Sequence, residues 1–275
     1  MLSALNIHEE MCPSGPIRIW DAGVQWADIE KQKGVYDWSK LDAMIEAAGK
    51  RSIMLVLGHP PAWAAKGGPD GSQASWMPPG SNRPPVTMAA WKRYVEAVVT
   101  RYKGRVSLYQ VWNEPADKRF YSGNLDELGT ICKNAYQVIK RIDKDARVVS
   151  TPLQPRKQAG WFKRGKEIVD YLKAAGYPFD IWSMHIYPQK GEGIEGFIRD
   201  CKLVIDELEG RPKNNFLWIT ETNYNLVGEG NPYPIDQQTK LKKQTEDACK
   251  ILDIDRIYWY SYMTNEPQLF AITEF

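Results

Sequence analysis

Short strand patterns and longer helical patterns alternate along almost the whole of this 275-residue chain. Runs rich in β-branched and aromatic residues predict eight strands, and the segments between most of them repeat apolar residues at the period of a helix buried on one face. The expected strands lie near residues 3–8, 16–21, 52–58, 107–113, 146–151, 179–186, 215–221 and 256–263. The expected helices span residues 39–48, 87–102, 124–142, 161–175, 194–208 and 236–252.

This alternation predicts an α/β fold in which a parallel sheet closes into a (β/α)8 barrel. Barrels of roughly 250 residues form one domain, and no linker-like change of composition divides the chain, so residues 1–275 are expected to be a single domain. Only about seven residues separate the first two strand patterns, and about a dozen follow the eighth. The first and last barrel helices are therefore expected to be short or missing.

Charge and cysteine content exclude several classes of partner. The chain has 36 Lys+Arg against 34 Asp+Glu, which indicates neither nucleic acid nor a membrane surface as the partner. Its four cysteines are far apart, which argues against a zinc site or a disulfide framework. The sequence as given shows no signal peptide and no membrane span. We expect a soluble protein, secreted if a signal was removed and otherwise cytoplasmic; the oligomeric state is not predicted.

Two glutamates follow strand patterns directly. The run from residue 107 to 112 leads into Asn113-Glu114-Pro115, and the run from residue 216 to 220 leads into Glu221. In a barrel the carboxyl ends of the strands meet at one face, so the two carboxylates are expected to face each other there. A carboxyl pair of this kind is typical of enzymes that break glycosidic bonds, where one acts as acid and the other as nucleophile.

The chain also contains a second copy of the Asn-Glu-Pro tripeptide, at Asn265-Glu266-Pro267. It trails the last strand pattern by several residues, and no later strand can supply a partner carboxylate. Glu114 is therefore preferred over Glu266 as the acid, although Glu266 lies in a loop that would overhang the same face.

In its order of motifs the chain resembles glycoside hydrolase clan A, and within it family 39 and related exopolysaccharide-cleaving enzymes. The motifs are Arg18-Ile-Trp-Asp21, Trp26-Ala-Asp-Ile-Glu30, Gly34-Val-Tyr-Asp-Trp38, Leu41-Asp42, Gly58-His-Pro-Pro-Ala-Trp63, Trp112-Asn-Glu-Pro115, His185-Ile-Tyr187, Thr220-Glu221 and Trp259. The resemblance implies that Glu114 is the acid/base and Glu221 the nucleophile, that Asn113 holds the sugar 2-hydroxyl, and that the anomeric configuration is retained.

Further side chains are expected around this pair. Arg18 ends the second strand pattern, where its charge would favour the ionised form of Glu221; the ordinary alternative is a surface ion pair. By the family match, His59 would hydrogen-bond sugar hydroxyls, and His185 with Tyr187 would orient Glu221. None of the chain's three histidines has acidic neighbours at metal-ligand spacing, so we expect no metal and no cofactor.

The aromatic residues divide into two groups. Trp259 is expected to form the apolar floor of the reacting subsite, with Trp63, Trp76 and Tyr233 extending the platform from long loops. Four other tryptophans are expected to pack between helices and barrel: Trp20, Trp38, Trp91 and Trp161. Asp21 and Glu30 are expected to be structural.

Residues 154–166 form a basic loop after the fifth strand pattern. Cations near a helix N-terminus are unfavourable, which raises the hypothesis that this loop recognises anionic sugars; a solvated basic loop is the ordinary alternative.

The sequence thus predicts a retaining glycoside hydrolase that acts on a polysaccharide or oligosaccharide, with internal cleavage favoured by the long aromatic loops. Two alternatives stay open: an exo-acting, β-xylosidase-like enzyme, and a carbohydrate-binding barrel without turnover. Xylan, mannan and bacterial exopolysaccharide are all possible substrates.

Overall fold

Seven parallel strands, β1 to β7, lie side by side in chain order in the part of the chain that the structure describes. The computed structural model describes residues 15–69, 72–155, 161–189, 191–210, 216–224, 235–260 and 271–274. The strands are β1 (Ile17–Ile19), β2 (Ile53–Leu57), β3 (Leu108–Val111), β4 (Arg147–Val149), β5 (Ile181–Ile186), β6 (Phe216–Thr222) and β7 (Arg256–Trp259). Each falls within a predicted strand or differs from it by about one residue.

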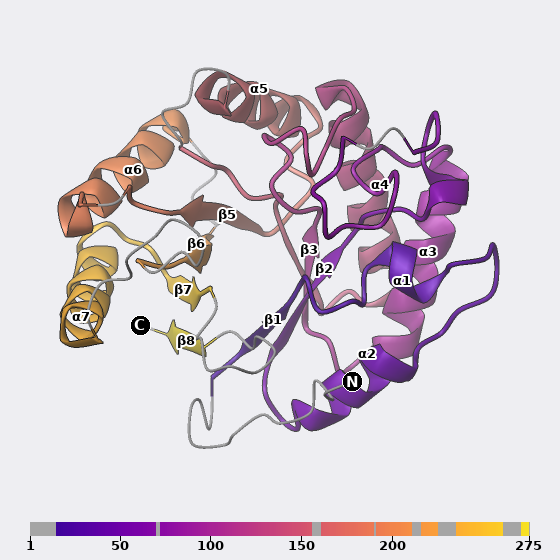
Figure 1. Ribbon diagram of the computed structural model, residues 1–275, viewed down its shortest axis with the longest axis horizontal. Coiled ribbons are helices and arrows are strands. Elements are labelled where there is room, and N and C mark those ends of the chain that lie inside the picture. The colour runs from indigo at the N-terminus through magenta and orange to yellow at the C-terminus, as the bar shows by residue number, and fades with distance from the viewer. Residues whose placement is uncertain are drawn as a thin grey trace.

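Helices surround this sheet, and Figure 1 shows them as a ring outside the strands. They are α1 (Trp26–Ile29), α2 (Ser39–Ala47), a short 3-10 turn η1 (Ala62–Ala64), α3 (Met88–Tyr102), α4 (Leu125–Ile142), α5 (Trp161–Ala174), α6 (Gly193–Glu207) and α7 (Ile235–Ile251). The six longer helices match the six predicted from apolar periodicity. Together with the parallel strands they form a nearly closed barrel of the expected TIM type.

Helix α4 illustrates why the periodicity was informative. Its buried side chains recur at helical spacing along one face and include Leu128, Ile131, Ala135 and Ile139. The helix begins in a capping box, in which Asn124 and Glu127 satisfy each other's backbone N–H groups.

The barrel interior has an apolar layer with a polar layer above it. The apolar layer takes one residue from each of six consecutive strands: Met54, Leu108, Val149, Ile181, Trp218 and Tyr258. Two residues further along three of these strands stand Gln110, Ser183 and Thr220, which are fully buried. Since side chains alternate along a strand, these polar residues also point inward, towards the carboxyl-terminal end of the barrel.

The two ends of the chain differ from the simple barrel plan. The strand predicted near residues 3–8 and the segment expected to lack the first barrel helix lie outside the described residues. After β7, strand β8 (Ala271–Glu274) pairs antiparallel with β7, which the sequence analysis did not predict.

Within the described residues, no helix combines the length and the apolar character that a bilayer crossing requires.

Candidate active site

Three non-glycine residues just past strand ends have left-handed backbones. They are His59 (φ 56°) after β2, and Trp112 (φ 67°) and Glu114 (φ 41°) after β3. Such backbones cost free energy and tend to gather at functional sites, where the surrounding structure holds them. Here they follow closely on β2 and β3.

A bulge in β6 positions Glu221. His185 of β5 pairs with Glu221 although the preceding pair joins Met184 to Ile219, so β6 carries one extra residue at this point. The same shift occurs against β7. The bulge lets two consecutive side chains, Thr220 and Glu221, both bond to groups inside the barrel, which a regular strand does not allow.

Arg18 of β1 connects the two strands that carry the glutamates. Its guanidinium is fully buried and pairs with Glu221 through Nη1 and Oε1 at 2.6 Å. Its Nη2 donates to Asn113 Oδ1 at 2.8 Å, and its Nε donates to Gln110 Oε1 at 2.8 Å. Arg18 is thus a buried partner of Glu221 rather than a surface ion pair.

Gln110 is a site residue that the sequence analysis missed. Besides accepting from Arg18, its Nε2 lies 2.9 Å from Ser183 Oγ, 3.2 Å from Thr220 Oγ1 and 3.2 Å from the Ser150 carbonyl. These bonds hold the Gln110 amide in place, and the amide in turn fixes the orientation of the Arg18 guanidinium. An amide in an otherwise apolar strand, two residues before Trp112, was the available signal.

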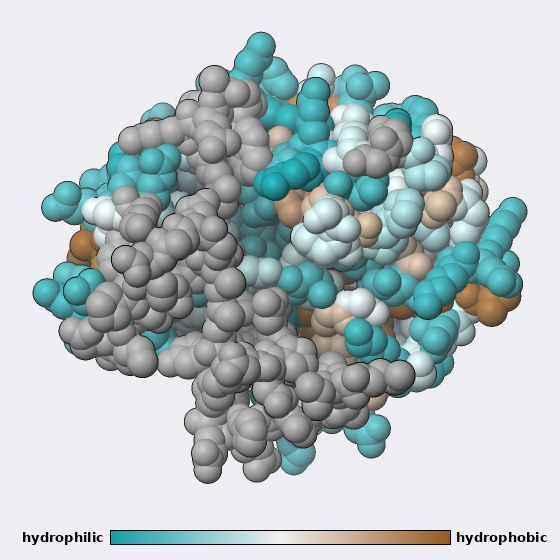
Figure 2. Space-filling model, viewed as in Figure 1, coloured by the Kyte–Doolittle hydropathy of each residue, from teal (hydrophilic) through white to brown (hydrophobic). Residues whose placement is uncertain are grey.

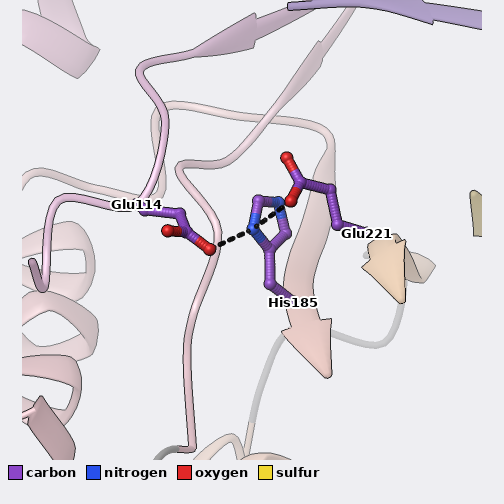
Figure 3. Close-up of side chains that lie close together, drawn as sticks. All are labelled: Glu114, His185 and Glu221. Atoms are coloured by element: carbon purple, nitrogen blue, oxygen red, sulfur yellow. Dashed lines mark hydrogen bonds and ion pairs between the residues drawn. The ribbon is translucent and has the colours of Figure 1, made fainter. Parts of the chain in front are cut away.

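His185 stands between the two glutamates, as Figure 3 shows. Its Nδ1 lies 2.9 Å from Glu114 Oε1 and 3.4 Å from Glu221 Oε2. One oxygen of each carboxylate and a nitrogen of His185 all lie within 4.8 Å of one another. This close approach is compatible with the roughly 5–5.5 Å between carboxyl groups that retaining glycosidases use.

Tyr187 completes the surroundings of Glu221. Its hydroxyl donates to Glu221 Oε2 at 2.9 Å. Burial, then the charges of Glu221 and Glu114, raise the pKa of Tyr187 well above its ordinary value, so the phenol keeps its proton and remains a donor.

Glu114, His185 and Glu221 are also a set of side chains that a metal ion can bridge. However, Arg18 pairs with one oxygen of Glu221 and Tyr187 donates to the other. A cation would have to displace Tyr187 and sit near a buried guanidinium. The donor set therefore fits a reacting carboxylate pair better than a metal centre.

His59 is fully buried, and its ring packs between Trp20 (centroid distance 4.8 Å) and Trp112 (4.7 Å). Burial lowers the pKa of His59 to about 3, so the imidazole is neutral. Its Nδ1 lies 3.2 Å from the Ser81 carbonyl and donates to it, which makes Nε2 an acceptor. Nothing in the described part of the chain hydrogen-bonds this Nε2, which is itself buried.

The neutral His59 predicts a pH dependence of stability. Its pKa is about 3 when folded and near 6.5 when exposed, so the unfolded chain binds one more proton between these values. The free energy of unfolding therefore falls as the pH falls below 6.5, by up to about 1.4 kcal/mol per pH unit from this residue. His59→Asn, which tolerates the left-handed backbone, should flatten the slope by nearly one proton. Urea unfolding of wild type and His59→Asn at pH 4 to 7 measures this slope. If the free energy of unfolding of the two proteins falls in parallel with pH, the prediction is wrong.

With this geometry established, comparison with known proteins identifies the family. The model of glycosyl hydrolase family 10 matches residues 20–201, about two thirds of the chain. The chain belongs to glycosyl hydrolase family 10. The match includes His59, Glu114 and His185, whereas Arg18 and Glu221 lie outside the matched span.

Other known proteins are similar to this chain in sequence or in fold. A curated β-xylosidase from Caldicellulosiruptor saccharolyticus is 28% identical over 160 residues. The matched region is 54% of this chain but only 30% of the length of that β-xylosidase. Xylanase Xyn10A from Cellvibrio japonicus has a similar fold (TM-score 0.61, 14% identity, 87% of this chain and 74% of that one). So does a family 39 glycoside hydrolase from Bacteroides cellulosilyticus WH2 (TM-score 0.60, 17% identity, 90% and 56%). The resemblance to clan A is confirmed, and the matching model within it is that of family 10.

The sequence analysis expected Trp63 and Trp259 to bind substrate, but the contacts that the structure gives for them lie away from Glu114 and Glu221. Trp63 donates its indole N–H to the Glu30 carbonyl at 2.9 Å and packs edge-on against Trp26. Trp259 lies under the ammonium group of Lys242 on α7, 5.7 Å from its ring.

Tyr260, the residue after Trp259, reaches the site instead. Its hydroxyl donates to Asp21 at 2.8 Å, and its ring lies 6.4 Å from that of Tyr187. Burial is the main cause that raises the pKa of Tyr260, and the charges of Asp21 and Glu221 add to it. Asp21, expected to be structural, therefore also borders the site.

Trp20 also differs from expectation, because it packs against His59 at the site rather than between helices and barrel. Trp91 and Glu30 are buried as expected: Trp91 packs against Trp26, and Glu30 accepts from the Trp26 indole at 2.6 Å.

The basic loop is described only in part. Arg164 donates to the carbonyls of Pro115, Tyr121 and Gly123, so it holds the segment that follows Glu114. Residues 156–160 of this loop lie outside the described residues, and so do Tyr233 and Glu266, which the sequence analysis also named.

Proposed function

We propose that this chain is a retaining glycoside hydrolase that cleaves β-linked bonds inside a xylose-containing polysaccharide or oligosaccharide. The observation that carries the proposal is the close approach of the Glu114 and Glu221 carboxylates around His185, with Arg18 and Tyr187 bonded to Glu221. The two carboxylates thus have different surroundings, which suits one acid and one nucleophile.

In the first step Glu221 attacks the anomeric carbon, and a bond forms between this carbon and a carboxylate oxygen as the glycosidic bond breaks. Glu114 gives its proton to the departing oxygen. Asn113 uses its Oδ1 to accept from Arg18, which leaves its NH2 group to donate to a sugar hydroxyl. His59 Nε2 supplies an acceptor for another hydroxyl.

In the second step the charge of Glu221 has been consumed by the glycosyl ester, and Glu114, now ionised, removes a proton from water. The water oxygen bonds to the anomeric carbon from the side that the leaving group vacated, and Glu221 departs as a carboxylate. Two inversions give net retention. All groups required are side chains of this chain, so the mechanism uses no cofactor.

The substrate class rests on the relatives. The curated relative is named a β-xylosidase, and several structures of similar fold are xylanases, one of them in complex with xylobiose. Internal cleavage is favoured by the long segment after β2, residues 58–87, which carries aromatic side chains beside the site.

The test is the release of reducing ends from xylan, mannan and bacterial exopolysaccharides, neutral and anionic, with product sizes resolved. We expect oligosaccharides from xylan, and proton NMR should detect the β-anomer first. The α-anomer appearing first contradicts retention, monosaccharide alone contradicts internal cleavage, and binding without release supports a binding barrel.

A further inference from the structure

Trp76 is a large aromatic side chain that stays 53% exposed beside the buried Trp20 and the partly buried Phe120. Its ring lies 6.0 Å from that of Trp20, edge-on, and 6.1 Å from that of Phe120. Phe120 in turn lies 6.2 Å from Trp20. The three rings form one aromatic cluster, and much of the Trp76 side chain remains exposed to solvent.

The segment that carries Trp76 is tied to the segment that carries Phe120. Asn82 donates to the Lys118 carbonyl at 3.0 Å and to Ser72 Oγ at 2.8 Å. The backbone N–H of Ser122 donates to the Asn82 carbonyl at 2.8 Å. These bonds join the loops after β2 and β3, so the segment that carries Trp76 is tied down before any ligand arrives, which lowers the conformational entropy lost on binding.

The aromatic cluster is continuous with the catalytic centre. Trp20 contacts both Trp76 and His59, and His59 packs against Trp112, two residues before Glu114. On the face of the molecule that Figure 2 shows, side chains of intermediate hydropathy lie among hydrophilic ones. A ligand that lies over the glutamates and His59 therefore meets Trp76 if it extends in this direction.

Polar groups border the same cluster. The Arg119 side chain is 60% exposed, with its guanidinium 5.9 Å from the centre of the Phe120 ring and paired with Asp117 at 2.6 Å. An aromatic face beside fixed hydrogen-bonding groups suits a sugar ring, which has an apolar C–H face and hydroxyls at its edge. Because Asp117 neutralises Arg119, the surface is matched to a neutral sugar.

We propose that Trp76 forms, with Arg119 at its border, a second sugar-binding subsite that holds a neutral pyranose unit of the same glycan bound at the glutamates. This inference rests on the proposed function and extends it: the enzyme binds a chain of sugars through a platform on the loop after β2.

The test compares Trp76→Ala with wild type on two substrates. β-Xylosyl fluoride fills only the subsite at the glutamates, whereas xylohexaose also reaches the platform. We expect kcat/KM for xylohexaose to fall about tenfold, mainly through KM, because one stacking contact is lost. The value for the fluoride should stay within about twofold, and Trp76→Phe should restore most of the loss.

The matched control is Phe216→Ala, an aromatic residue 44% exposed at the amino-terminal end of β6, which should leave both substrates unaffected. An equal loss on both substrates, or no loss on xylohexaose, overturns the subsite. If wild type cleaves neither substrate, the proposed function is wrong. Calorimetric titration of xylohexaose then decides the subsite: about tenfold weaker binding by Trp76→Ala supports it, and equal or absent binding overturns it.

Discussion

Replacing Glu221 with Gln should lower kcat for hydrolysis by at least about 10⁴-fold, in the range that loss of a nucleophile costs in other covalent-intermediate hydrolases. The amide has nearly the shape of the carboxylate but cannot form the glycosyl ester. Initial rates on the substrate identified by the reducing-end panel measure the effect. The folded fraction must be measured as well, because the substitution leaves the buried guanidinium of Arg18 without its counter-charge, which is expected to cost about 3 kcal/mol of stability.

Glu30→Gln provides a matched control for that loss of stability. Glu30 is also fully buried, accepts from Trp26 Nε1 at 2.6 Å and from the Gly34 backbone at 2.8 Å, and has an arginine, Arg93, at 3.6 Å. Its amide variant should lose stability but keep kcat within a few-fold of wild type. Turnover by folded Glu221→Gln above about 1% of the wild-type rate, well beyond what a lost nucleophile leaves, contradicts the assigned nucleophile.

The barrel was predictable because strands covered on both faces are continuously apolar, and helices covered on one face are periodic. β2 is buried at all five positions, and α4 repeats its apolar residues along one face. These patterns depend only on burial, which a sequence records directly. The two glutamates were predictable for a related reason, because strand ends in a parallel barrel meet at one face.

What the sequence could not supply was parity, that is, which way a given side chain points at a strand end. Tyr258 faces the barrel interior, so Trp259 points outward and Tyr260 points back towards the site. The sequence analysis expected Trp259 at the site, whereas the structure places the next residue, Tyr260, there. In β6 the bulge adds a residue and turns Glu221 inward beside Thr220. A one-residue shift reverses the face that a side chain occupies, and apolar patterning does not record it.

The hydrogen bonds between buried polar side chains were the other feature that could not be predicted from the sequence. Gln110 bonds to groups on four strands or strand ends, at sequence separations of 40 to 110 residues. Such a contact is defined only once the strands lie side by side. Arg18 was recognised because a charge in an apolar strand requires a partner, whereas a neutral amide is less conspicuous.

Replacing Glu114 with Ala should lower turnover of xylan by about 10² to 10⁴-fold, the range that general acid–base catalysis contributes. The expected effect depends on the leaving group, unlike that of Glu221→Gln. A 2,4-dinitrophenyl xyloside needs no proton to depart, so its first step should stay fast, and the glycosyl enzyme should accumulate because no base activates water. A burst of dinitrophenol followed by a slow steady state, seen by stopped-flow absorbance, is the expected signature.

Azide should rescue the Glu114→Ala variant, because an anion that needs no base can enter the space the carboxylate leaves beside His185. The product should be the β-xylosyl azide, with the configuration of the substrate, since azide attacks the glycosyl ester on Glu221 from the opposite side. Glu266→Ala, in the second Asn-Glu-Pro copy, is the control and should show neither the burst nor the azide product. If Glu266→Ala shows them and Glu114→Ala does not, the acid has been assigned to the wrong copy of the motif. If azide gives the α-anomer, no covalent intermediate on Glu221 is formed, and the close spacing of the carboxylates has been misread.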